Sequence, residues 1–172
     1  ALRERFAKFA LELHPEKTKI VYCKDAKRKG TYDQTKFTFL GFEFRPRFVK
    51  NSKTGELFMS FTAAVSSAAL TAMRQTIRRM NLRNRTDLSL QDIASQYNPI
   101  LQGWIEYYGK YQLSALHPML RHFNMTLVAW AMRKFKRFKR RKSRAFDFLV
   151  DLSRTCPEIF VHWKRGMVGA FA

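Results

Sequence analysis

Apolar residues near the start of the chain recur at steps of three and four, from residue 2 to residue 13. This period predicts an amphipathic helix. We expect the helix to end at His14-Pro15, because a residue that precedes proline avoids helical backbone angles. The run at residues 19–23 is short and rich in β-branched and aromatic side chains, which predicts a strand. Residues 24–36 are polar and predict a loop.

The pattern changes to alternation over residues 37–44, where every second side chain belongs to the same face of an expected strand. Residues 56–62 form a second candidate strand after turn-forming residues at 51–55. We therefore expect a β-hairpin over residues 37–62. Central pairing is expected to stop at Pro46, because proline lacks a backbone N–H. The better core face of the first strand carries Thr38, Leu40, Phe42 and Phe44.

From residue 63 onward the apolar period is helical, and nothing further in the sequence predicts a strand. Ser66 or Ser67 is expected to cap a helix that reaches about Met80. Residues 82–87 are polar and predict a link to the next helix.

Ser89 and Asp92 resemble a capping box and predict the start of that second helix. Asn98-Pro99 is expected to interrupt it, with Pro99 as the first residue of a third helix. A further apolar stripe over residues 116–130 predicts a helix that continues into the basic residues after it.

Together these elements predict an α+β fold that is mainly α. A short helix, a strand and a β-hairpin come first, and an all-helical bundle follows. We expect three parts along the chain: residues 1–62, a helical domain at 63–142, and a C-terminal helix and tail at 143–172.

The charge of the chain narrows the function classes. It holds 33 Lys and Arg against 13 Asp and Glu, a net charge of +20. Such an excess favours binding of a polyanion, with nucleic acid ahead of an anionic membrane surface. No apolar run approaches the roughly 20 residues that span a bilayer. Cys23 and Cys156 lack the paired spacing of zinc or disulfide frameworks, so we expect a reducing compartment, the bacterial cytoplasm or an organelle.

No pattern in the sequence indicates a catalytic centre. Carboxylates are scarce and scattered, whereas two-metal chemistry needs several that converge. The GxxxxGK, GxSxG and HExxH motifs are absent. We therefore expect these residues to hold no catalytic group, no metal and no cofactor.

The strongest physical signal is the basic segment at residues 133–144, where nine of twelve residues are Lys or Arg. Phe135 and Phe138 stand three positions apart within it, so a continuous helix would place both rings on one side. Mutual repulsion among the cations would be relieved by an anionic groove. The aromatic stretch that includes Trp104 and Tyr108 is a second candidate surface, although such a stripe also suits a seam between helices.

Three stretches, in this order, resemble one family: His14–Ile20 (HPEKTKI), Phe39–Phe42 (FLGF) and Asn98–Tyr108 (NPILQGWIEYY). The chain resembles the C-terminal part of a group II intron-encoded reverse transcriptase/maturase. The third stretch is fairly specific, and the ordered set is the stronger signal.

This resemblance implies that residues 1–62 are the end of the palm and that Leu40-Gly41-Phe42 belongs to a primer-grip hairpin. Residues from about 63 would form the thumb, also called the maturase or X domain. In that family the thumb closes on the template–primer duplex and helps to bind intron RNA for splicing. The YxDD motif of the polymerase is absent and is expected upstream of Ala1, in a longer parent that would need Mg²⁺.

The expected partners are group II intron RNA and an RNA/DNA template–primer duplex, with no membrane. Two alternatives stay open: a stand-alone basic RNA- or DNA-binding protein, and a protein–protein module. A homodimer that forms through exposed strand edges or through the aromatic helix face is a further open alternative. The predicted nucleic-acid contacts are Lys17, Gly41, Arg45, Arg47, Arg74, Arg78, Arg79, Arg133, Lys134, Lys136, Arg137, Lys139, Arg140, Arg141 and Lys142.

Overall fold

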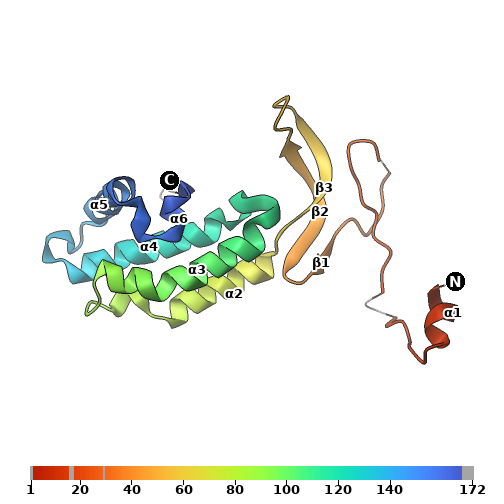
Figure 1. The fold of residues 1–172 in the computed structure, drawn as a ribbon, viewed down its shortest axis with the longest axis horizontal. Helices are drawn as coiled ribbons and strands as arrows, with labels where there is room; N and C mark the ends of the chain where they lie inside the picture. The colour runs from red at the N-terminus through yellow and green to blue at the C-terminus, as the bar shows by residue number, and fades with distance from the viewer. Residues whose placement is uncertain (1, 16–17, 29, 168–172) are drawn as a thin grey trace. The chain divides into compact units, whose positions relative to one another are not determined.

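The computed structural model describes residues 2–15, 18–28 and 30–167, and these fall into two units (Figure 1). The first unit takes the described residues of 1–37 and 44–62. The second takes those of 38–43 and 63–172, and it contains most of the helices. The fold class is α+β and mainly α, as the sequence predicts.

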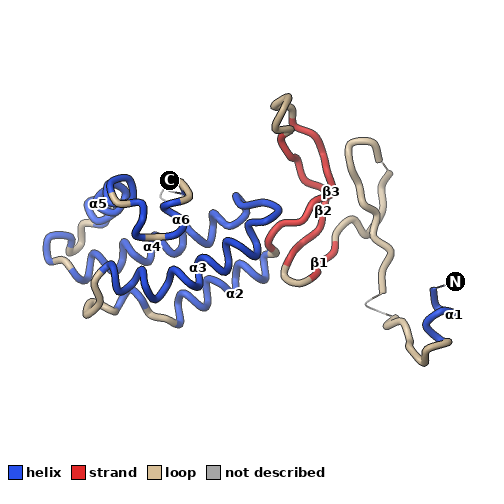
Figure 2. The backbone as a smooth tube through the Cα atoms, in the orientation of Figure 1, coloured by secondary structure: helices blue, strands red, loops and turns tan. Residues whose placement is uncertain are grey.

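Most of the chain before the sheet is loop (Figure 2). Helix α1 spans only Leu2–Ala7, so the predicted helix at residues 2–13 is wrong in its second half. The reason is that Phe9 and Leu11 are exposed, and a short helix without packing on one face is marginal in water. The predicted strand at 19–23 is also wrong, because this segment is irregular and Ile20 is 96% exposed.

The sheet has three antiparallel strands in the order β1-β2-β3. Strand β1 spans Phe37–Phe39, β2 spans Phe42–Lys50 and β3 spans Leu57–Val65. The expected single strand at residues 37–44 is therefore two strands. Strand β2 continues through Pro46, but as expected it is not paired on both edges there. Since β1 has only three residues, β2 pairs with β3 alone at Pro46 and needs no N–H on its other edge.

The turn between β1 and β2 consists of Leu40 and Gly41. Their φ angles are +48° and +79°, and a two-residue type I′ hairpin turn requires positive φ at both positions. This turn corrects the predicted core face, because Leu40 is 67% exposed while Phe42 is 8% exposed. Phe44 is half-buried and stacks on Phe37, with 4.6 Å between the ring centroids.

The second unit is built on three long helices, α2 (Ser67–Arg79), α3 (Leu90–Gln112) and α4 (His117–Lys134). Both predicted N-terminal caps are confirmed. The Ser66 hydroxyl accepts from Ala69 N–H, and Ser89 and Asp92 form a reciprocal capping box. Two further helices follow, α5 (Lys142–Thr155) and the short α6 (Val161–Lys164). Single 3₁₀ turns join them: η1 (Leu82–Asn84), η2 (Leu113–Leu116), η3 (Lys136–Phe138) and η4 (Pro157–Ile159).

Helix α3 passes through Asn98-Pro99 without a break, so the predicted interruption there is wrong. Proline in a helix interior removes one backbone hydrogen bond. Here the amide of Asn98 is tied to a distant segment, donating to Ile159 O at 2.9 Å and accepting from Val161 N–H at 3.1 Å. The buried side chains of Tyr97 and Leu101 continue one apolar face on both sides of the proline, and this packing outweighs the missing bond.

The core of the second unit lies along α3 and α4, and α5 and α6 pack against it (Figure 1). Its largest fully buried side chains include Phe123, Trp130, Phe160 and Trp163. Within the core, the Asn124 carbonyl oxygen accepts from Trp163 Nε1 and contacts His162 Nε2 at 2.9 Å. The segment after residue 157, for which the sequence predicts no clear structure, therefore supplies core residues up to Met167.

Candidate nucleic-acid interface

Helix α4 ends at Lys134, so the basic segment is not one helix as predicted. Phe135 has extended backbone angles, η3 makes a single turn, and α5 begins at Lys142. The cause is aromatic packing. Phe138 is 6% exposed and lies against Phe135 and Phe148, with ring centroids 5.8 and 5.2 Å away. The chain must leave the helix to bury these rings, which are therefore core side chains and not a platform for bases.

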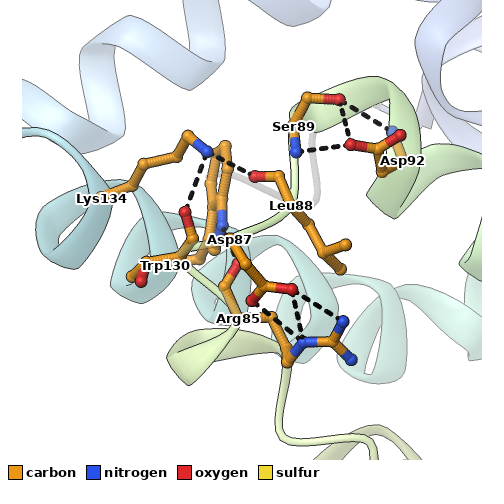
Figure 3. A network of polar contacts seen from close by, with 8 residues as sticks. Arg85, Asp87, Leu88, Ser89, Asp92, Trp130 and Lys134 are labelled. Atoms are coloured by element: carbon orange, nitrogen blue, oxygen red, sulfur yellow. Dashed lines mark hydrogen bonds and ion pairs between the residues drawn. The ribbon is translucent and has the colours of Figure 1, made fainter.

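The last residues of α4 hold the loop that joins α2 to α3 (Figure 3). Lys134 Nζ donates to Thr86 O at 3.0 Å and to Leu88 O at 2.6 Å. Trp130 Nε1 donates to Arg85 O at 3.0 Å, and the ammonium of Lys134 lies 5.6 Å from the centre of the Trp130 ring. Lys134, a predicted phosphate contact, thus satisfies carbonyl groups of the protein itself.

Carboxylates in the same loop are also engaged locally (Figure 3). Arg85 donates to both oxygens of Asp87, and this hydrogen bond lowers the pKa of the Asp87 carboxyl below its ordinary value. Asp92 accepts from the Ser89 hydroxyl and backbone N–H, which lowers its pKa in the same direction. Neither carboxylate therefore neutralises the basic residues after α4.

Arg133 and Arg137 also have partners within the protein. Arg133 Nη1 donates to Arg83 O at 3.3 Å and to the side-chain oxygen of Asn84. The guanidinium carbon of Arg137 lies 4.6 Å from the centre of the Phe138 ring, a cation–π distance. We call Arg133, Lys134 and Arg137 the anchor residues, because their side chains, at the end of α4 and in η3, contact other groups of the protein.

The remaining cations of the segment are exposed. Their side chains form no hydrogen bond or ion pair with another residue in the described ranges. Arg140 has a φ of +60°, an unusual angle for a residue other than glycine. The anchor residues and the buried Phe138 fix the backbone on one side, and α5 fixes it on the other. We call five of these six cations the basic loop: Lys136, Lys139, Arg140, Arg141 and Lys142; the sixth, Arg144, lies further along α5.

Helix α2 carries the predicted arginines Arg74, Arg78 and Arg79. Arg78 and Arg79 are exposed and Arg74 is half-buried. Arg74 donates to Thr71 Oγ1 at 3.2 Å and Arg79 to Thr76 Oγ1 at 3.4 Å. These contacts lie along the helix itself, so they orient the guanidinium groups without neutralising them.

The hairpin turn, although part of the sheet, belongs to the helical unit. Tyr107 Oη donates to Leu40 O at 3.1 Å, and the Phe42 ring lies among Tyr107, Tyr108 and Tyr111. A Cβ on Gly41 would lie 2.6 Å from Tyr108 Oη. Glycine is thus required here by the turn and by the tyrosine that covers it. Two of the three stretches that support the family resemblance, FLGF and the IEYY part of the third, are therefore in direct contact.

Arg45 and Arg47 lie two residues apart on β2, within the first unit, so they share one face of the strand. Arg45 is exposed and Arg47 is half-buried. Lys17, another predicted contact, lies outside the described residues. The predicted cations of α2 and of residues 133–142 thus belong to the second unit, and the hairpin arginines belong to the first.

Sequence reasoning missed Arg83 and His122, which face a pocket beside Arg78. No local motif marks them, since they come from η1 and α4. Across the described ranges, no group of three or more His, Cys, Asp or Glu is placed to hold a metal ion. Both cysteines are unpaired, and no described helix is long and apolar enough to cross a membrane.

The fold and this surface define a basic helical domain that carries a small sheet. Residues 70–146 match the family model described as "Group II intron, maturase-specific domain". The match runs from α2 through the whole basic loop into α5, and it confirms the resemblance found in the sequence. Over residues 70–146 the chain is similar to this maturase-specific domain. No curated protein and no solved structure gives a significant match.

Proposed function

We propose that this chain binds group II intron RNA through its helical unit and thereby assists splicing of the intron. One observation carries the proposal: the maturase-specific match includes the whole basic loop, whose five cations have no described side-chain partner. The anchor residues beside them are bonded internally, so the loop is held in place while its charges stay available to a ligand.

The expected contact is with the phosphate backbone. Lysine and arginine that neutralise phosphates release counterions, which makes affinity depend steeply on salt. Such contacts position the protein without reading sequence. RNA helices present phosphates and 2′-hydroxyls across a wide minor groove, so recognition of shape is the expected mode.

A second function, gripping of a template–primer duplex in a longer reverse transcriptase, is favoured by the hairpin. Its turn matches the FLGF stretch of the resemblance, and Arg45 and Arg47 share one strand face. In that longer protein, other residues would supply the catalytic carboxylates, and those carboxylates would bind the Mg²⁺. Association of two chains through strand edges or through the aromatic face of α3 stays a prediction.

Binding of a structured intron RNA across a salt series tests the proposal. In the test variant all five basic-loop cations are replaced by Gln. A matched variant removes the same charge from exposed cations elsewhere in the helical unit: Lys110, Arg121, Arg154, Lys164 and Arg165. We expect the magnitude of the log–log slope to fall by about 0.7 to 0.9 for each phosphate that the variant no longer neutralises, and only in the basic-loop variant. If the slope fell equally in both variants, the change would depend only on net charge, and the proposal would be contradicted.

A further inference from the structure

A pocket of about 450 Å³ lies between the C-terminal end of α2, the turn at η1 and the middle of α4. All of these elements belong to the helical unit. Neither the family match nor the basic loop assigns it a role. Its lining residues are Ile77, Arg78, Asn81, Leu82, Arg83, His122 and Thr126.

The polar groups of the pocket suit an anion. Arg78 and Arg83 supply two permanent positive charges, and no Asp or Glu lines the pocket. The carbonyl oxygen of the Asn81 side chain accepts from Asn84 Nδ2 at 2.6 Å, which leaves the Asn81 amide nitrogen as a donor. Asn81 has a φ of +50°, an angle that asparagine tolerates better than most residues.

His122 adds an unsatisfied polar atom. Its Nε2 is buried and has no hydrogen-bond partner in the described structure. A buried nitrogen left unpaired is costly, and such groups in native proteins call for an explanation. Burial lowers the pKa of His122, and the nearby charges of Arg78 and Arg74 lower it further. Both causes disfavour the charged imidazolium, so a bound anion that accepts from an Nε2–H would satisfy this nitrogen and offset the nearby positive charge.

We propose that this pocket binds a phosphate group of the RNA together with its adjoining ribose. The inference rests on the proposed function and gives the RNA a second point of attachment besides the basic loop. Arg78 and Arg83 pair with the phosphate oxygens, because guanidinium groups match them in geometry and charge. Asn81 and His122 complete the hydrogen bonds, and the pocket has more room than a lone phosphate fills.

The pocket is also tied to the basic loop through the backbone. Arg133, next to the start of that loop, donates to the carbonyl of Arg83 and to the side chain of Asn84. Both acceptors belong to η1, which forms one wall of the pocket. A strand of RNA that follows the basic loop therefore meets a wall fixed to the same helix end.

The first test uses the full chain and NMR, with inorganic phosphate and uridine monophosphate as probes. We expect both to shift the His122 imidazole resonances saturably and to raise the imidazole pKa, with uridine monophosphate binding several-fold tighter. The Arg78→Gln/Arg83→Gln variant should show little of this response. Arg121→Gln, which removes a charge beside His122 in sequence but outside the pocket lining, should keep it. The proposal would be contradicted if neither probe changed the His122 resonances of the native protein. It would also be contradicted if Arg121→Gln responded as weakly as Arg78→Gln/Arg83→Gln.

The second test separates the pocket from the proposed function. In RNA binding, Arg78→Gln/Arg83→Gln should weaken affinity about tenfold and lower the salt slope by roughly one for each phosphate that the pocket binds. If this variant binds RNA as tightly as the native protein, while the basic-loop variant loses affinity, the pocket does not bind RNA. That result would leave the proposed function intact. A phosphate response at His122 in a protein that binds no intron RNA would show a free anion site and reject both RNA roles.

Discussion

The end of α4 and the basic loop carry the same kinds of side chain in different surroundings. Lys134 donates to two carbonyl oxygens and lies over Trp130, whereas Lys139 and Arg140 are exposed and contact no described acceptor. Both regions look alike in sequence, as a run of cations. The difference lies in whether a cation has an acceptor within the protein, and under the proposed function only a cation without one is available to RNA.

The largest expected effect on stability is at the hairpin turn. There the comparison is between two uncharged residues, one with a close neighbour and one without. Gly41→Ala adds a methyl group 2.6 Å from Tyr108 Oη at a positive φ. Gly55→Ala is a matched control, because its φ is +76° but the nearest atom lies 3.7 Å away. Urea unfolding should show Gly41→Ala less stable than Gly55→Ala by about 1–3 kcal/mol. Equal stabilities, with duplex binding abolished only in Gly41→Ala, would favour a nucleic-acid contact at the turn.

Removing the ammonium of the anchor residue Lys134 should cost stability. Lys134→Met keeps most of the aliphatic stem but leaves Thr86 O and Leu88 O without this donor, so we expect the free energy of unfolding to fall by about 2 kcal/mol. Lys139→Met removes the same charge from the basic loop and should leave the free energy of unfolding within about 0.5 kcal/mol of the native value. An equal loss of stability in the two variants would contradict the distinction between the anchor residues and the basic loop.

We expect the free energy of unfolding to fall in acid because of His162. The stabilities of the variants above should therefore be compared near neutral pH. Burial lowers the pKa of His162 to about 3, from an ordinary 6.5. Between those values the unfolded chain binds a proton that the folded chain does not, so stability falls as pH drops below 6.5. The expected slope is about 1 kcal/mol per pH unit for this group, measured by unfolding between pH 6.5 and 5. His162→Gln should reduce that slope, and an unchanged slope would assign the acid sensitivity to other groups.

Arg140→Gly gives the smallest stability effect and separates charge from structure. The φ of +60° at Arg140 suits glycine, so the variant should be as stable as the native chain or more stable by up to about 1 kcal/mol. Its affinity for RNA should still fall, because the variant has one cation fewer to neutralise a phosphate. A variant that gains stability and keeps full affinity would remove Arg140 from the interface.

Local signals in the sequence predicted the elements that depend on neighbouring residues. The caps at Ser66 and Ser89 were found because each hydrogen bond joins residues three apart. The passage of α3 through Pro99 was missed, because it depends on contacts between Asn98 and residues some 60 positions away. The break after Lys134 was missed for a similar reason, since it follows from Phe138 packing on Phe148.

The charge of the chain predicts a cationic surface, but it does not show which of the cations are engaged within the protein. Nothing in the residues 133–142 themselves distinguishes Lys134, whose acceptors lie near position 87, from Lys136. Arg83 and His122 were missed because they meet only when η1 packs on α4. The sequence therefore shows a surplus of cations, and tertiary packing decides which of them have partners within the protein.

The central claim is tested most directly by a matched pair of variants in an RNA-binding salt series. Lys139→Gln/Arg140→Gln and Arg133→Gln/Lys134→Gln each remove two charges, and circular dichroism confirms that each is folded at the pH of the assay. The account predicts that the loop pair lowers the magnitude of the log–log slope by about 1.4 to 1.8, while the anchor pair changes it by much less. An equal or larger change in the anchor pair would contradict the division between cations that hold the fold and cations that bind RNA.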